Sequence, residues 1–253
     1  MYVNKFPHQY SLKKKKNDDY ADQPKKKKFK KMDEDEDNDD GQMELPFDPF
    51  NLDKPEDENV FQLDNHIYFT ADVSMKTVNK LAKLVHNTNK EFELLVSSVG
   101  HMAHVNPKPI FLHITSVGGD LFAGFRAVDI IQNSTIPIYT IAEGYAISSA
   151  SLMYLAGKKR FMSRNSYLLI HQLSNYHADG SSETFEKAKD DFSNNMMLMN
   201  QLYDFYISVS NGKLNKKKVE DILKHDLYWN YETCFKYGLA DDYYNSETLK
   251  KYN

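Results

Sequence analysis

The sequence predicts an α/β layered fold, and three observations support this prediction. Short runs rich in β-branched and aromatic residues alternate with segments whose apolar residues recur at helical spacing. Glycine-containing turns join two of these runs to the helical segment that follows. The alternation continues to the C-terminal end without any further internal repeat. Such a pattern favours a layered fold with crossover connections.

Residues 1–58 differ in composition from the rest of the chain. They hold 12 of the 32 basic and 16 of the 36 acidic residues, which leaves a balanced 20 of each for residues 59–253. Two KKKK runs and the block DEDEDNDD stand here among few branched apolar residues, too few to offset chain entropy by burial. We predict a disordered charged extension at 1–58, with LPFDPF as a short docking or packing segment, and one folded domain at 59–253.

Composition also limits which binding partners and which cellular location we expect. The lysine clusters could contact nucleic acid or an anionic surface, but the adjacent acidic block favours a solvated tail, so nucleic-acid binding is not expected. No apolar run reaches the ~18–20 residues that span a bilayer, and the first residues lack the apolar core of a signal peptide. Cys234 is the only cysteine, which excludes an intrachain disulfide and a cysteine-based zinc site. We expect a cytoplasmic protein without membrane attachment.

The first predicted elements lie at 66–134. The run HIYFTADV (66–73) predicts a strand, and the apolar spacing of 74–90 predicts a helix with Ser74 as its N-cap. The run 108–116 predicts a buried strand, and a glycine turn leads from it into a helix over 120–134.

The remaining elements repeat this order. A strand ending in glycine and a helix closed by glycine come first, then a strand, a long helix, a short helix and a final strand. These predicted elements are 136–144, 146–157, 167–173, 182–209, 215–226 and 236–244.

Two strand-to-helix turns contain glycine, namely Val117-Gly118-Gly119 and Glu143-Gly144-Tyr145. Glycine at such a place permits unusual backbone angles or lets a ligand approach bare backbone N–H groups. A structural role alone would explain one such turn. Two of them at the ends of successive strands favour a functional site at that edge of the sheet.

The stretch EGYAISSASLMYLAG contains Ser148, Ser149 and Ser151, more hydroxyls than a helix interior needs. Ser148 lies near the predicted helix start, where free amides would stabilise a developing oxyanion. His171 ends a predicted strand and would reach the same edge as a general base, although a histidine at such a place is more often only a polar end to a core strand. Asp226 is one of several carboxylates that could orient the histidine. These residue types are compatible with a serine hydrolase.

Four separated motifs carry a family resemblance. PIFLHITSVGGDLFAG, GYAISSASLMYLAG, KRFMSRNSYLLIHQ and YGLADD occur in this order within residues 60–245. Together they resemble the proteolytic subunit of the Clp protease, a family of self-compartmentalised serine peptidases. The resemblance implies a ClpP/crotonase-like spiral of ββα units with a protruding handle helix. It also implies a homo-oligomeric ring, in some members a stacked double ring, that an AAA+ unfoldase can serve with polypeptide substrates.

The resemblance also assigns roles to individual residues. It places the nucleophile at Ser148, the general base at His171 and the orienting acid at Asp226. The oxyanion donors correspond to the backbone N–H groups of Gly119 and Ser149. This set performs acyl transfer without a cofactor or a metal ion.

Several positions depart from the family pattern. His113 stands where an aromatic residue often lines the docking pocket for the ATPase, which argues against a conventional unfoldase. Leu227 replaces an arginine that helps couple two rings, which argues against a double ring. The segment 91–107 forms a longer loop than usual, and its pair His101 and His104 is not expected to bind a metal.

Four functions remain to be compared. The first is a Clp-type endopeptidase that cuts unfolded or tethered polypeptides in an oligomeric chamber. The second is a capsid or assembly maturation protease of the same family, working without an ATPase. The third is a crotonase-like acyl-CoA enzyme, which shares the fold but does not require Ser148, His171 and Asp226. The fourth is an inactive interaction subunit, which the complete set of three residues argues against.

Overall fold

The computed structural model describes residues 59–99, 106–174 and 184–252, which belong to a compact unit that begins at Asn51. The predicted charged extension 1–58 and its LPFDPF segment lie outside the described residues, as do His101 and His104. The proposed division at residue 58 therefore stays a prediction. Within the described residues, no helix is long and apolar enough to cross a membrane.

A seven-stranded sheet forms the centre of the described domain, in the order β1-β2-β3-β4-β5-β7, with β6 paired to the end of β4. Strand β1 runs antiparallel to β2, and every other pair is parallel, as the crossover pattern predicts. The strands are β1 (Val60–Leu63), β2 (His66–Phe69), β3 (Ile110–Ser116), β4 (Ile138–Ile147), β5 (Lys159–Met162), β6 (Tyr167–Leu169) and β7 (Asp242–Tyr243).

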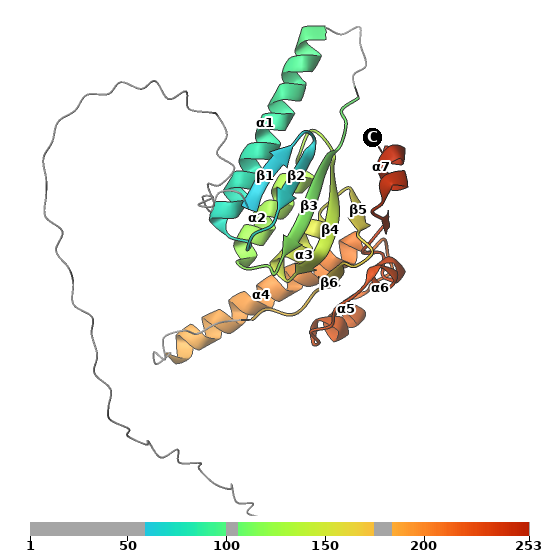
Figure 1. Cartoon of the computed structure of the whole chain (residues 1–253). Coiled ribbons are helices and arrows are strands. Elements are labelled where there is room, and N and C mark those ends of the chain that lie inside the picture. Colours follow the sequence, from blue (N-terminus) through green and yellow to red (C-terminus); the bar gives the residue numbers. More distant parts are fainter. Residues whose placement is uncertain (1–58, 100–105, 175–183, 253) are drawn as a thin grey trace, which may run out of the picture. The chain divides into compact units, whose positions relative to one another are not determined.

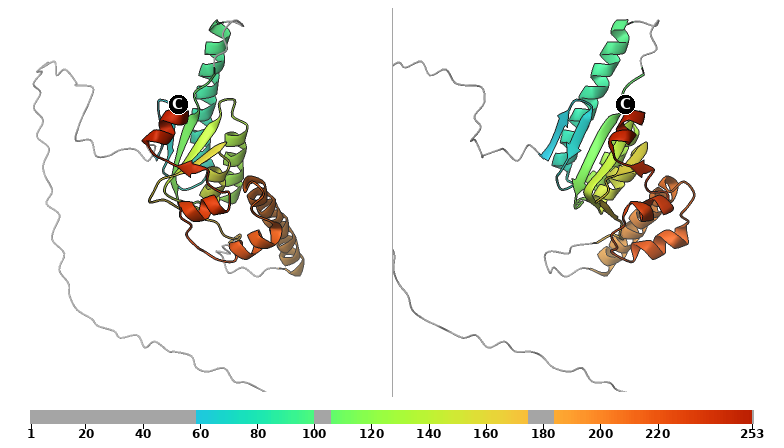
Figure 2. Two further views of the ribbon diagram at one scale, coloured as in Figure 1. Left: turned by 90° about the vertical axis from the view of Figure 1, so that its right-hand side faces the viewer. Right: turned by 45° about the vertical axis from the view of Figure 1, so that its right-hand side comes forward.

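The helices cover the sheet unequally (Figure 1). Figure 2 shows α1 and α2 on one side of the sheet and the short α7 on the other. The main core lies under the first group, while Phe111, Ile141 and Phe161 form a small second cluster that Tyr252 of α7 covers. The helices are α1 (Met75–Val99), α2 (Leu121–Gln132), α3 (Ser149–Leu155), α4 (Phe185–Val209), α5 (Lys216–Leu223), α6 (Tyr231–Lys236) and α7 (Ser246–Tyr252).

Helix α1 begins as predicted and ends later than predicted. Its first turn is capped by Ser74, whose hydroxyl accepts from the Thr77 N–H at 3.2 Å. The helix then runs to Val99, through residues that we expected in a loop. No glycine or proline interrupts this stretch before Gly100, and Leu94 and Leu95 stay exposed on the protruding end that Figure 1 shows. The loop predicted at 91–107 is thus shorter than the sequence suggested, because its first residues belong to α1.

Strand β4 also extends beyond its predicted end at Gly144. Gly144 adopts φ 68° inside the strand, and the pairing with β3 shifts register between Ile114 and Ser116. Beyond this irregularity, Tyr145 to Ile147 pair with β6. The turn into the next helix therefore falls on Ser148 and not on the glycine.

Helix α4 is the long helix predicted over 182–209. Thr184 caps it by accepting from the Lys187 N–H at 3.3 Å. Only Leu202 and Tyr206 on this helix are buried, whereas Phe185 and Phe192 are exposed near its free end. Figure 1 shows the helix extending past the sheet, as the predicted handle helix would.

Candidate active site

Ser148 occupies a sharp turn between β4 and α3. Its backbone has φ 55° and ψ −127°, a conformation that residues with a side chain rarely adopt. Three hydrogen bonds hold it there. The Ser148 N–H donates to the Leu169 carbonyl at 2.9 Å, and the Ser148 carbonyl accepts from the N–H and hydroxyl of Ser151 at 2.9 and 2.6 Å. The Ser148 hydroxyl itself has no hydrogen-bond partner in the described part of the chain. It is therefore available as a nucleophile on a sharp strand-to-helix turn.

Gly118 and Gly119 lie directly beside this turn. Their φ angles are 92° and 147°, and a Cβ atom on Gly118 would stand 2.8 Å from the Ser148 Cβ and 3.1 Å from the Ser149 nitrogen. A Cβ on Gly119 would stand 2.3 Å from the Val73 carbonyl oxygen, because Val73 pairs with this segment. Only glycine fits at either position.

The two expected oxyanion donors are therefore held by packed backbone. The Val73 N–H donates to the Gly118 carbonyl, and the Asp120 N–H donates to the Val73 carbonyl, each at 2.8 Å. The N–H groups of Gly119 and Ser149 donate no hydrogen bond within the described residues. Free N–H groups held this rigidly beside a serine can receive the negative oxygen of a tetrahedral intermediate.

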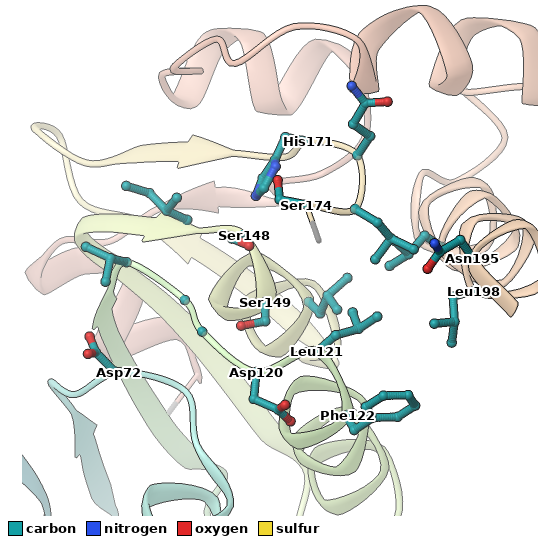
Figure 3. A pocket seen from close by; sticks show the side chains of 18 of the residues that line it. Asp72, Asp120, Leu121, Phe122, Ser148, Ser149, His171, Ser174, Asn195 and Leu198 are labelled. Atoms are coloured by element: carbon teal, nitrogen blue, oxygen red, sulfur yellow. The ribbon is translucent and has the colours of Figure 1, made fainter. Parts of the chain in front are cut away.

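His171 lies two residues beyond the end of β6 and lines the same cavity as Ser148. Figure 3 shows its ring above Ser148 at this cavity, whose volume is about 680 Å³. No hydrogen bond joins the two side chains, and neither ring nitrogen has a partner among the described residues. The structure thus brings the predicted base to the predicted nucleophile without closing the contact, which is common before substrate binds.

Asp226 lies in the segment between α5 and α6. This segment runs beside the His171 strand, because Leu168 and Trp229 exchange two backbone hydrogen bonds and the Gln172 N–H donates to the Leu223 carbonyl. These contacts bracket Asp226 opposite the residues around His171. Its carboxylate nevertheless is exposed, does not line the cavity and accepts no hydrogen bond among the described residues. The third member of the set is near but not connected.

Several residues of the cavity carry no sequence motif. Asp72 enters it from the segment after β2, and Asn195 and Leu198 enter it from α4. Tyr206 of α4 lines the cavity as well and also belongs to no motif. Burial raises the pKa of Tyr206 to about 12, although a hydrogen bond to Ser151 opposes the shift, so the phenol remains neutral.

Metal ligands do not gather at this site. In the ranges that the structure describes, no group of three or more histidine, cysteine, aspartate or glutamate side chains could hold an ion. The described residues of the cavity supply a hydroxyl, an imidazole and free backbone N–H groups, together with the carboxylates of Asp72 and Asp120.

Comparison with known proteins agrees with this geometry. The family model of the Clp protease matches residues 69–247. ATP-dependent Clp protease proteolytic subunit 2 of Treponema denticola is 36% identical over 135 residues, which cover 52% of this chain and 64% of that protein. The proteolytic subunit of Cyanophora paradoxa is 29% identical over 187 residues, which cover 68% of this chain and 93% of that protein. The chain therefore spans less than two thirds of the Treponema relative.

The fold agrees as well. A ClpP1 mutant from Listeria monocytogenes superposes with a TM-score of 0.55 at 18% sequence identity, covering 71% of this chain and 91% of that one. The α/β class with a parallel sheet is thereby confirmed, including its likeness to ClpP. With its family model matched over most of the described domain, this chain belongs to the Clp protease family, a family of serine peptidases.

Proposed function

We propose that this chain is a Clp-type serine endopeptidase that hydrolyses unfolded or tethered polypeptides within an oligomeric chamber. One observation carries the proposal. Ser148 sits on a strained strand-to-helix turn beside the packed pair Gly118-Gly119, and His171 faces the same cavity. This combination supports a peptidase over a crotonase-like acyl-CoA enzyme, which needs the free amides but neither the serine nor the histidine.

The proposed reaction is acyl transfer. His171 accepts the hydroxyl proton as the Ser148 oxygen attacks the peptide carbonyl, and the N–H groups of Gly119 and Ser149 bind the resulting oxyanion. His171 then donates this proton to the leaving amine. Water hydrolyses the acyl-enzyme by the same proton transfers. Asp226 holds the imidazole in the required tautomer and stabilises the imidazolium.

Assembly completes the site in this proposal. Asp226 is exposed in the single chain, so a neighbouring subunit that packs against the segment 224–228 would bring its carboxylate toward His171. The exposed Phe185, Phe192 and Met197 of α4 offer an apolar contact between rings. A homo-oligomeric ring is the assembly that we propose. A second ring would stack through α4, without the coupling arginine that Leu227 replaces.

An ATPase partner distinguishes the two candidate peptidase functions. The relatives' names describe ATP-dependent proteases, and an AAA+ unfoldase is accordingly our first candidate. One observation favours the alternative of a capsid or assembly maturation protease without an ATPase. His113 is buried between His66 and Glu143, so it offers no open aromatic pocket to an unfoldase. We also propose a cytoplasmic location, with which the single free cysteine Cys234 is compatible.

A fluorophosphonate probe tests the proposed activity directly. We expect covalent labelling and peptide cleavage by the assembled wild-type protein, and loss of both in Ser148→Ala. Ser208→Ala, which removes an exposed serine of α4, is the matched control and keeps the label. An unlabelled wild type would overturn the peptidase, and a label that persists in Ser148→Ala would overturn this nucleophile.

A further inference from the structure

The peptide unit that joins Ser148 to Ser149 carries one of the two expected oxyanion donors. Its carbonyl belongs to Ser148, and its N–H belongs to Ser149. Because this peptide bond is planar and trans, its carbonyl and its N–H point in opposite directions. Whatever holds the oxygen therefore also aims the N–H. A strained conformation such as that of Ser148, with φ 55° and ψ −127°, persists only where surrounding contacts hold it.

Ser151 holds the oxygen of this peptide unit with two hydrogen bonds. Its N–H donates to the Ser148 carbonyl at 2.9 Å, and its hydroxyl donates to the same oxygen at 2.6 Å. Ser151 is fully buried, so bulk solvent does not compete for these bonds. Two donors on one carbonyl oxygen use both of its lone pairs, which restrains rotation of the whole peptide unit.

Tyr206 of α4 completes the arrangement. It is 2% exposed, and its hydroxyl forms a hydrogen bond with the Ser151 side chain. Since the Ser151 hydroxyl uses its proton toward the Ser148 carbonyl, the neutral tyrosine donates and the serine oxygen accepts. A hydroxyl that accepts one hydrogen bond donates a stronger one, because the two bonds polarise each other. The bonds thus run from a cavity-lining residue of α4 to the peptide unit that carries the oxyanion donor.

We propose that Ser151 and Tyr206 are positioning residues that aim the Ser149 N–H at the oxyanion. They act through the peptide unit and not by contact with the reacting atoms. Ser151 restrains the carbonyl, and Tyr206 keeps the Ser151 hydroxyl in its donating orientation. Three elements then hold the Ser148 turn, namely β6 through the Leu169 carbonyl, α3 through Ser151 and α4 through Tyr206. This positioning role rests on the proposed peptidase function, and the experiment below separates the two.

Ser151→Ala and Tyr206→Phe each remove one hydroxyl and keep the rest of the side chain. With the assembled enzyme and a quenched fluorescent peptide, we expect kcat to fall about tenfold in Ser151→Ala and about threefold in Tyr206→Phe. Removing an oxyanion donor altogether costs about 10²–10³, and here the donor is only misaligned. KM should stay at the wild-type level, since the lost interaction belongs to the transition state. The double variant should be no slower than Ser151→Ala, because Tyr206 acts through Ser151.

A peptide boronate gives a readout that a purely structural role would not move. Its tetrahedral adduct with Ser148 places a boron-bound oxygen where the oxyanion forms. The inhibition constant of the boronate should therefore rise in both variants by the same factor as kcat/KM falls. Thermal unfolding of each variant measures stability separately. If Ser151→Ala fails to fold, the milder Tyr206→Phe still provides the comparison.

Two control variants remove comparable hydroxyls elsewhere. Ser166→Ala deletes a hydroxyl that donates to the Ser163 carbonyl at 2.8 Å. The Ser166 N–H donates to the same oxygen at 3.1 Å, so this turn repeats the pattern of Ser151, and Ser166 is equally buried. Tyr154→Phe deletes a buried phenol of α3 whose hydroxyl has no hydrogen-bond partner among the described residues. Both controls should keep the wild-type kcat and the wild-type boronate inhibition constant.

Each outcome decides a specific point. A wild-type kcat and boronate inhibition constant in folded Ser151→Ala or Tyr206→Phe would overturn the positioning role. Losses that multiply in the double variant, or equal losses in the controls, would overturn it as well. Fluorophosphonate labelling of the wild type reports the peptidase itself. If the wild type is labelled while these variants behave like it, only the positioning role fails. If the wild type is not labelled, the proposed function fails.

Discussion

Two sets of residues in this domain combine histidine with a carboxylate. Hydrogen bonds join the first set in the structure, and none joins the second. In the first, which we call the strand cluster, His66 Nδ1 lies 2.8 Å from His113 Nε2, and His113 Nδ1 lies 3.0 Å from Glu143 Oε1. These residues join β2, β3 and β4, and the Tyr68 ring stacks on His113 with centroids 4.4 Å apart. The polar groups of the strand cluster are paired, and His113 is only 3% exposed.

The second cluster is the set Ser148, His171 and Asp226, where no hydrogen bond joins the three side chains. The backbone around it is held tightly, yet its functional side chains face a cavity or solvent and have no hydrogen-bond partner among the described residues. The same residue types thus serve stability in one place and remain available in the other. A fold leaves polar groups unpaired mainly where a ligand or another subunit will pair them. Variants should therefore separate the two clusters, one by activity and one by stability.

The largest expected effect is that of Asp226→Asn. If Asp226 orients His171 in the assembled enzyme, kcat should fall by about 10⁴, because the wrong imidazole tautomer is then favoured. The melting temperature of the unassembled chain should not change, since this carboxylate is exposed and accepts no hydrogen bond among the described residues. Peptide cleavage and thermal unfolding measure the two quantities.

Asp221→Asn is the control for that variant. It removes a carboxylate of α5 that forms only an exposed pair with Lys224, 2.9 Å away, and such pairs contribute little. We expect near wild-type kcat. If Asp226→Asn retained full kcat in the assembled protein, Asp226 would not be the third catalytic residue.

The sequence predicted the elements with strong periodicity. The segments that became β3, α2 and α3 combine uninterrupted apolar patterns with glycine or capping residues at their ends. The predicted end of β4 at Gly144 was wrong. Glycine is typical of turns, and the pairing of residues 145–147 with β6 is a tertiary interaction that the local sequence does not show. The strand β1 and the helices α6 and α7 are too short to give a recognisable period.

In the candidate site too, the local sequence does not show which neighbours a residue will have. His113 in FLHIT and His171 in LLIHQ both follow a run of apolar residues. Only the folded chain shows that the first is hydrogen-bonded and that the second has no partner among the described residues. Motif resemblance pointed to Ser148 and His171, and both line one cavity in the structure. Asp72 could not be found, because its place beside the serine depends on the pairing of Val73 with Gly119.

The second prediction concerns His113 in the strand cluster. His113→Phe keeps the aromatic stacking but leaves His66 and Glu143 without their shared partner, at a cost of about 1–3 kcal/mol in the free energy of unfolding. Urea unfolding measures this loss, while peptide cleavage per assembled subunit should stay at the wild-type level. An active-site defect without a loss of stability would contradict the division between the two clusters.

The smallest expected effect is the pH dependence contributed by His66. Burial lowers the pKa of His66 below its ordinary 6.5, and repulsion from His113 adds to this, while Asp64 and Glu143 act in the opposite direction. Between the folded pKa and 6.5, the unfolded chain therefore binds more protons at this residue than the folded one does. Stability is full above pH 6.5 and decreases as the pH falls below it.

Thermal unfolding in a series of buffers from neutral to mildly acidic measures this slope. His66→Phe retains the stacking on Phe111, whose ring centroid lies 4.9 Å from that of His66, and removes the titrating group. Its melting temperature should start lower, because His113 loses a partner, and should then depend less on pH than that of the wild type. His86→Gln, which removes an exposed histidine of α1, keeps the wild-type slope. If the pH dependence of the melting temperature were unchanged in His66→Phe, protonation of His66 would not be what destabilises the strand cluster. The hydrogen bonds of this cluster would then be insensitive to acid.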